Sequence, residues 1–221
     1  MCSSRLPAPQ PHGGASARLM ARVAGLALAS LTVLAACGEP ARPATKDAVL
    51  PVDGRPREVE IRLYRSPPYF PLAFTTYLPP DVRVDEAPPG ESAALAFVRE
   101  EDGGVRGGAF VHLFVAPAGA SEQRARALVR AAARRFQIPG AETKLKPARA
   151  HRWVVEEYEL RSRGTVRDRL GWIALGRQDE RWFLLIVQVP VRLAESFGPR
   201  ADRIVDEWTW AGGERLSRLT D

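Results

Sequence analysis

The chain has 221 residues, of which 45% are hydrophobic and 26% are charged. These are ordinary values for a globular protein, and they exclude a wholly disordered chain and a polytopic membrane protein. The 32 Lys and Arg residues against 26 Asp and Glu give a formal charge of +6. Only three of the basic residues are Lys, which together with 19 Pro is typical of a GC-rich genome. The Arg excess is therefore weak evidence for an anionic ligand, and two cysteines cannot form a disulfide framework.

The N-terminal region contains an apolar segment that is typical of a signal peptide. Arg22 precedes an uninterrupted run of apolar or small residues, 23–36. This run is too short to cross a hydrocarbon core of about 30 Å as a helix, but it has the length of a signal-peptide h-region. It ends in Leu34-Ala35-Ala36-Cys37, which resembles the lipobox of bacterial lipoproteins. The alternative is a buried cysteine that ends an ordinary helix, but the run has no amphipathic pattern, and Pro40 follows closely.

The lipobox resemblance implies a processing route and a location. Cys37 would receive a diacylglyceryl group and become the N-terminus after residues 1–36 are removed, and two or three acyl chains on one residue anchor a protein stably. Residue 38 is Gly, whereas Asp at this position retains enterobacterial lipoproteins in the inner membrane. The resemblance therefore implies the outer membrane, with the domain facing the periplasm. Residues 1–19 lack the basic start of a signal peptide, so our hypothesis is that translation begins at Met20.

Residues 37–57 are predicted to be a lipidated cysteine followed by a Pro-rich tether. A coil of this length has a mean reach of roughly 25 Å, and about 70 Å when extended. Loss of Arg5, Arg18 and Arg22 with the signal peptide lowers the formal charge from +6 to +3. This charge gives little support to nucleic-acid binding. The expected partners are the membrane, through Cys37, and an envelope protein or glycan.

Residues 58–213 are predicted to form one α+β domain, followed by a polar tail at 214–221. Apolar residues that alternate or run continuously between turns and prolines predict seven strands, at 58–64, 72–78, 94–99, 109–115, 152–161, 167–176 and 181–189. Ser121 is predicted to cap a helix that runs to about Phe136. A second helix is predicted through Phe197 and Val205, and a short strand at Trp208–Trp210. The architecture expected is a mainly antiparallel sheet with two helices packed on it, an α/β/α sandwich.

This order of elements resembles the PsbP-like family of α/β/α sandwiches. The matching features are Tyr77-Leu-Pro-Pro-Asp81, the helix that begins at Ser121, the meander that ends in Val189-Pro190, and Asp206-Glu-Trp-Thr-Trp210. The long strand at 58–64 and the two terminal tryptophans depart from the family pattern. The resemblance implies a fold used mainly for binding and assembly, with no catalytic residues to transfer.

The sequence contains no motif for a metal, a cofactor or a catalytic nucleophile. Besides Cys37, the mature chain offers only His112 and His151 as nitrogen or sulfur ligands, so no metal is expected. His112 lies in a predicted strand between two phenylalanines, which favours a structural histidine over a catalytic one. His151 is expected to be solvated.

Four residues are candidates for contact with a ligand or partner. Glu156 shares a strand face with apolar residues, so it is either a general acid held protonated by burial or, as we favour, half of a cross-strand pair with Arg167 or Arg169. Arg163 and Arg167 belong to an Arg-rich loop that would suit lipid phosphates or acidic glycans, although a solvated face is favoured. Trp210, which precedes Ala-Gly-Gly, is predicted to be an exposed binding aromatic.

Three functions remain open at this point. The first is a non-enzymatic lipoprotein whose domain binds a protein or envelope component. The second is a small envelope hydrolase or transferase that uses Glu156 or His112 as its acid or base. The third is a ligand sensor, which would contain a closed apolar cavity between sheet and helix.

Overall fold

A computed structural model describes residues 42–86, 93–99, 101, 103, 108–135, 142–147, 153–164 and 168–216. The side chains of residues 142–147 and 163 are not described. The described residues belong to one compact unit, residues 39–221. The predicted signal peptide and Cys37 lie outside the described residues.

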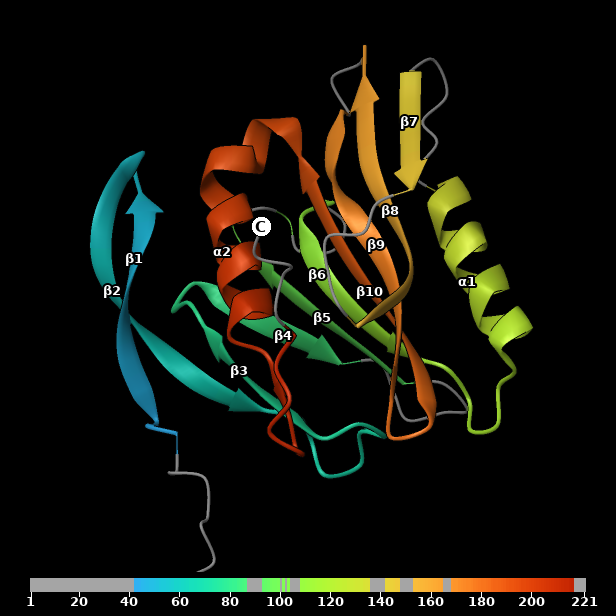
Figure 1. The fold of residues 1–221 in the computed structure, drawn as a ribbon. Helices are drawn as coiled ribbons and strands as arrows, with labels where there is room; N and C mark the ends of the chain where they lie inside the picture. The colour runs from blue at the N-terminus through green and yellow to red at the C-terminus, as the bar shows by residue number, and fades with distance from the viewer. Residues whose placement is uncertain are drawn as a thin grey trace, which may run out of the picture. The chain divides into compact units, whose positions relative to one another are not determined.

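The described strands form two antiparallel sheets (Figure 1). Sheet A has four strands in the order β1-β2-β3-β11, and sheet B has seven in the order β4-β5-β6-β10-β9-β8-β7. The strands of sheet A are β1 (Thr45–Val52), β2 (Arg55–Arg65), β3 (Phe74–Leu78) and β11 (Thr209–Trp210). Those of sheet B are β4 (Val82–Glu86), β5 (Ala93–Arg99), β6 (Phe110–Val115), β7 (Glu142–Pro147), β8 (Val154–Arg163), β9 (Arg169–Gln178) and β10 (Arg181–Pro190).

One helix covers each face of sheet B. Helix α1 (Glu122–Arg135) packs on β8, β9 and β10, and Ser121 caps it by accepting a hydrogen bond from the N–H of Arg124 at 3.3 Å. Helix α2 (Ala194–Asp206) follows the 3₁₀ turn η2 (Val191–Leu193) and contacts both β10 of sheet B and β1 and β3 of sheet A. Figure 1 shows α2 between the two sheets. The predicted α+β sandwich is therefore confirmed, and sheet A forms an additional layer outside α2.

The main core lies between sheet B, α2 and the β3–β11 part of sheet A. Its centre is aromatic: the ring of Trp208 stacks on that of Phe74 with 3.9 Å between centroids and meets Phe97 and Trp210 edge-on. A second core lies under α1 and includes Val129, and a third, smaller one joins β1, β2 and β3. The apolar strand faces predicted from the sequence supply most of these residues.

The predicted tether is wrong for residues 45–57, because they form the β1–β2 hairpin. Ala48 and Leu50 of β1 are buried against Ile61 of β2 and Tyr77 of β3, so the alternating small and apolar residues serve as a strand. The turn is Asp53-Gly54, and both residues have positive φ, 51° and 72°. This is the geometry of a two-residue type I′ turn, for which Asp-Gly is a preferred sequence. The domain thus begins before residue 58.

The C-terminal boundary also extends beyond the prediction. Residues 214–216 do not belong to a polar tail, since Leu216 is buried in the main core and its N–H donates to the Trp208 carbonyl at 3.2 Å. The strands β4 and β7 were not predicted either, because their sequences alternate charged residues with few apolar ones.

We expect Gly54→Ala to destabilise the protein by about 1 kcal/mol, because an L-residue with a Cβ is strained at φ 72°. A Cβ at Gly54 would meet no atom within 4 Å, so the cost is conformational rather than steric. Gly212→Ala is the matched control, since a Cβ there is equally unobstructed and no positive φ is required. Urea unfolding followed by circular dichroism measures both, and equal effects would contradict this assignment of the turn.

Candidate functional site

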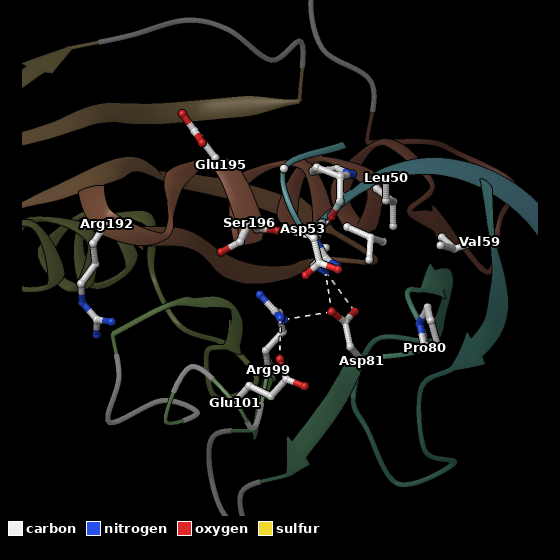
Figure 2. Close-up of a pocket in the computed structure, with 14 residues that line it drawn as sticks. Leu50, Asp53, Val59, Pro80, Asp81, Arg99, Glu101, Arg192, Glu195 and Ser196 are labelled. Carbon is white, nitrogen blue, oxygen red and sulfur yellow. Dashed lines mark hydrogen bonds and ion pairs between the residues drawn. The ribbon is translucent and has the colours of Figure 1, made fainter. Parts of the chain in front are cut away.

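A cleft of about 540 Å³ lies at one end of the domain (Figure 2). The β1–β2 turn, the start of α2, the end of β5 and the loop between β3 and β4 enclose it. Most of its lining side chains are charged or polar. Its charged lining residues include Asp53, Asp81, Arg99, Arg192, Glu195 and Arg200.

Asp81 is the central group of this cleft. Its carboxylate accepts hydrogen bonds from Nε of Arg200 at 2.7 and 3.0 Å, and Nε of Arg99 lies 2.9 Å from it. The side chains of Arg200 and Arg99 are only 7% and 11% exposed, whereas Asp81 is 25% exposed. Figure 2 shows Asp81 and Arg99 pointing toward one another, with Glu101 beside Arg99. Two guanidinium groups thus hold one carboxylate at the wall of the cleft.

The local sequence explains how these three residues meet. Pro79-Pro80 ends β3, and the N–H of Val82 donates to the Pro79 carbonyl at 3.1 Å, so the chain turns and Asp81 lies at the turn. Arg200 comes from α2 and also donates to the carbonyls of Pro51 at 3.0 Å and Ser196 at 2.5 Å. The ion pairs therefore join α2 to β5 and to the loop between β3 and β4, and the hydrogen bond to Pro51 adds the hairpin.

The charged side chains at the mouth of the cleft are exposed. Asp53, Arg192 and Glu195 are exposed, and Figure 2 shows them apart from one another. The wall therefore offers fixed, mutually compensated charges, and the mouth offers free charges of both signs. This combination suits recognition of a polar group that carries hydrogen-bond donors and acceptors.

Glu156 is half-buried and engaged, but not by the predicted partners. Its Oε2 lies 2.8 Å from Nη1 of Arg126 on α1, and its Oε1 accepts a hydrogen bond from the Tyr158 hydroxyl at 2.7 Å. This hydrogen bond is the main cause of the raised pKa of Tyr158. The predicted pairing with Arg167 or Arg169 is wrong for Arg169, which donates to Gln188, and Arg167 lies outside the described residues. The partner of Glu156 is a helix residue, Arg126, because Glu156 faces α1 rather than the neighbouring strand.

His112 lies on β6 at the edge of a second, shallower cleft of about 240 Å³. The other lining residues are Asp85, Glu86, Ala94 and Ala96, so neither a hydroxyl nor a thiol is among the described lining groups. Burial lowers the pKa of His112, which keeps the imidazole neutral at pH 7. The strand order places β6 and β8 three strand spacings apart, about 14 Å, so His112 and Glu156 do not form one site.

The remaining sequence candidates do not join the cleft. Trp210 is wrong as an exposed binding aromatic: it is 4% exposed, because β11 pairs with β3 and turns the ring onto Phe183 and Trp208. Arg163 ends β8, but its side chain is not described. Cys37 and His151 lie outside the described residues. Within the described ranges, no group of three His, Cys, Asp or Glu residues is arranged to hold a metal ion.

Comparisons with known proteins concern the fold alone. The chain matches no protein-family model. It also matches no curated protein sequence. Among solved structures it is similar to the solution structure of cyanobacterial PsbP (CyanoP) from Synechocystis sp. PCC 6803, with a TM-score of 0.43 and 7% sequence identity over 80% of this chain and 98% of that one. CyanoP is a PsbP protein, the family whose resemblance was expected from the order of elements.

Sequence reasoning missed the cleft, although two signals for it were present. Asp81 belongs to the Tyr77–Asp81 segment, and Asp53-Gly54, which lines the same cleft, is a hairpin signal in the sequence. Neither signal indicates that Arg99 and Arg200, which lie 18 and 119 positions further along the chain, converge on Asp81.

We expect the protein to lose stability as the pH falls from about 7 to about 5, in part through His112. The unfolded chain takes up a proton near the ordinary histidine pKa, whereas the folded state resists it, so folding weakens below that pH. His112→Gln should reduce the difference in urea midpoint between the two pH values. An unchanged difference would contradict the role of His112.

Proposed function

We propose that this protein is a bacterial lipoprotein, anchored to a membrane through Cys37, whose domain binds a protein or envelope component without catalysing a reaction. The observation that supports an anchor at Cys37 is the apolar run 23–36, which ends in Leu34-Ala35-Ala36-Cys37. Among the described residues, no helix is long and apolar enough to cross a membrane. The outer membrane, with the domain in the periplasm, is the proposed location because residue 38 is Gly.

The geometry of the Asp81 cleft supports the binding part of the proposal. Asp81, Arg99 and Arg200 are held by ion pairs and backbone hydrogen bonds, so their positions are fixed before a ligand arrives. Fixed polar groups reduce the ordering cost of binding. Because Asp81 is shared between two guanidinium groups, its charge is already compensated and favours a structural or recognition role over proton transfer.

Labelling with radioactive palmitate in a bacterial host tests the anchor. The chain has two cysteines, Cys2 and Cys37, which provide a matched pair of variants. We expect Cys37→Ser to lose the label and leave the membrane fraction, while Cys2→Ser keeps both. Label that persists in Cys37→Ser would overturn the anchor.

Site-specific photo-crosslinking in intact cells tests the cleft as the binding site. A photoreactive residue at Glu195, on the mouth of the cleft, should give a defined crosslinked species. The control position is Val155 on β8, which is 39% exposed and does not line the cleft. Equal crosslinking at both positions, or none at Glu195, would overturn the assignment of the cleft.

A further inference from the structure

Arg42 is fixed to the body of the domain, which shortens the chain available to a membrane anchor. Its guanidinium donates to the hydroxyls of Thr75 at 2.9 Å and Thr209 at 3.1 Å, and to the carbonyl of Glu207 at 3.0 Å. It also forms an ion pair with the Glu207 carboxylate at 3.3 Å and lies over the ring of Tyr77. The side chain is only 18% exposed.

The residues that follow Arg42 are fixed as well. The Pro43 carbonyl accepts a hydrogen bond from the Tyr77 hydroxyl at 2.9 Å, and the Ala44 carbonyl accepts one from the N–H of Leu63 at 2.7 Å. Lys46 forms an ion pair with Glu207 at 2.7 Å. Burial raises the pKa of Glu207, but the hydrogen bonds and charges of Lys46 and Arg203 outweigh it, so the pKa is lowered and the carboxylate stays charged at neutral pH.

A lipid anchor on Cys37 would therefore be attached through a very short linker. The five residue-to-residue steps from Cys37 to Arg42 span at most about 17 Å when fully extended. Helix α2, whose 13 residues extend for about 20 Å, runs from η2 to the residues that Arg42 contacts. The linker is therefore shorter than helix α2. An anchor at Cys37 would hold the Arg42 end of the domain, rather than the η2 end, near the bilayer.

The surface at the same end carries exposed groups that suit a lipid headgroup region. The β2–β3 loop and the turn after β11 lie together there, because the N–H of Ala211 donates to the Ala73 carbonyl at 2.9 Å. Arg65, Tyr69 and Arg215 are exposed on these two segments. Figure 1 shows the β2–β3 loop and the start of β1 at the end of the domain opposite η2.

The ring of Tyr69 is held outward. It is 53% exposed, and its hydroxyl donates to Glu86. Tyrosine is enriched at membrane–water interfaces, where its ring meets the apolar phase and its hydroxyl meets water. Arginine pairs with lipid phosphates. Glu214 and Glu86, the partner of the Tyr69 hydroxyl, are acidic residues on the same surface, so with Arg65 and Arg215 the four exposed ions balance and present both signs to the headgroups.

We propose that this end of the domain, with Arg65, Tyr69 and Arg215, lies against the bilayer that holds the Cys37 anchor. The proposal rests on the proposed anchoring and deepens it, because it assigns a membrane-facing surface to the domain. The Asp81 cleft is then directed away from the bilayer, since the β1–β2 turn and the start of α2 line it.

Hydrogen exchange read by mass spectrometry tests the surface. The acylated mature protein is placed in vesicles of phosphatidylethanolamine and phosphatidylglycerol and compared with the Cys37→Ser protein mixed with the same vesicles. We expect severalfold slower exchange at residues 66–73 and 211–215 of the anchored protein, and no change at 53–54 and 191–193. Slower exchange at 53–54 and 191–193, or no slowing at either end, would overturn the proposal.

A second experiment tests the membrane-facing surface independently of natural acylation. Protein that begins at Cys37 is coupled through its thiol to a maleimide phospholipid in the same vesicles, which imposes the anchor chemically. If the natural protein takes no palmitate but the coupled protein shows the expected pattern, the anchoring proposal fails and the surface stands. If palmitate is incorporated but neither preparation shows the pattern, the anchor stands and the surface fails.

Charge-reversal and release variants sharpen the test. Arg65→Glu with Arg215→Glu should remove most of the slowing at 66–73, whereas Arg192→Glu, at the opposite end, should not. Arg42→Gln should also reduce the slowing, because it frees chain between the anchor and β1, while Arg57→Gln on exposed β2 is its control. Slowing that neither the Arg65→Glu/Arg215→Glu double variant nor Arg42→Gln reduces would contradict the assigned contacts. Unchanged exchange in β9 and β10 checks that each variant is folded.

Discussion

Asp81→Ala should lower the free energy of unfolding by about 3 kcal/mol, the lower end of the range for breaking a buried ion pair. The reason is that the change leaves Arg200, 7% exposed, without its carboxylate and removes a carboxylate that pairs with Arg99. The cost stays at the lower end because Asp81 itself is 25% exposed. Urea unfolding followed by far-ultraviolet circular dichroism measures the effect.

Asp85→Ala is the matched control for this prediction. Asp85 lies on β4, four residues further along, and also pairs with an arginine, Arg83. Its side chain is 34% exposed and that of Arg83 is 48% exposed, so the pair is screened by water and should contribute less than about 1 kcal/mol. Equal losses in the two variants would show that Asp81 is not a structural centre of the cleft.

Trp208→Ala should be the most destabilising single change in the main core, with a loss of about 3–5 kcal/mol. Trp208 is fully buried, stacks on Phe74 and lies edge-on to Phe97 and Trp210. Truncation therefore leaves a cavity at the point where α2, sheet A and sheet B meet. The same unfolding measurement applies.

Trp208→Phe separates lost packing from a lost hydrogen bond. The indole N–H of Trp208 has no hydrogen-bond partner among the described residues, so replacing it with a phenyl ring removes no hydrogen bond. We expect a much smaller loss than for Trp208→Ala, because most of the ring contact with Phe74 is kept. A Trp208→Phe loss as large as that of Trp208→Ala would indicate that a polar contact of the indole dominates.

Regular hydrophobic patterns made most of the domain predictable. The alternation in β2, the continuous apolar runs of β6 and β10, and the apolar stripe of α1 each indicated the correct element. Strand β1 was missed because Pro51 lies within it and its surroundings are rich in proline, which is typical of a linker. Its burial comes from Ile61 and Tyr77, which a local pattern does not reveal.

The sites were less predictable because they depend on tertiary contacts. The Glu156 partner is Arg126, 30 positions earlier on α1, and a search for cross-strand pairs does not reach it. Trp210 precedes a Gly pair that is typical of an exposed turn, but its pairing with Phe74 turns the ring inward. The Asp81 site needs three segments that only the folded chain brings together.

The β1–β2 hairpin also changes the expected relation of the domain to the membrane. A tether of about 20 residues would let the domain stand off by tens of ångströms. With Arg42 and β1 fixed to the body, only the residues between Cys37 and Arg42 remain as linker. Under the proposed anchoring at Cys37, one end of the domain would face the membrane and the Asp81 cleft would lie at the other.

The most direct test of this account is the mass of the N-terminal peptide of the protein extracted from membranes. The proposed anchor predicts a peptide that begins at Cys37 and carries the added mass of a diacylglyceryl group, with or without a further acyl chain. A peptide that begins elsewhere, or an unmodified thiol at Cys37, would contradict the anchor on which the proposed function depends.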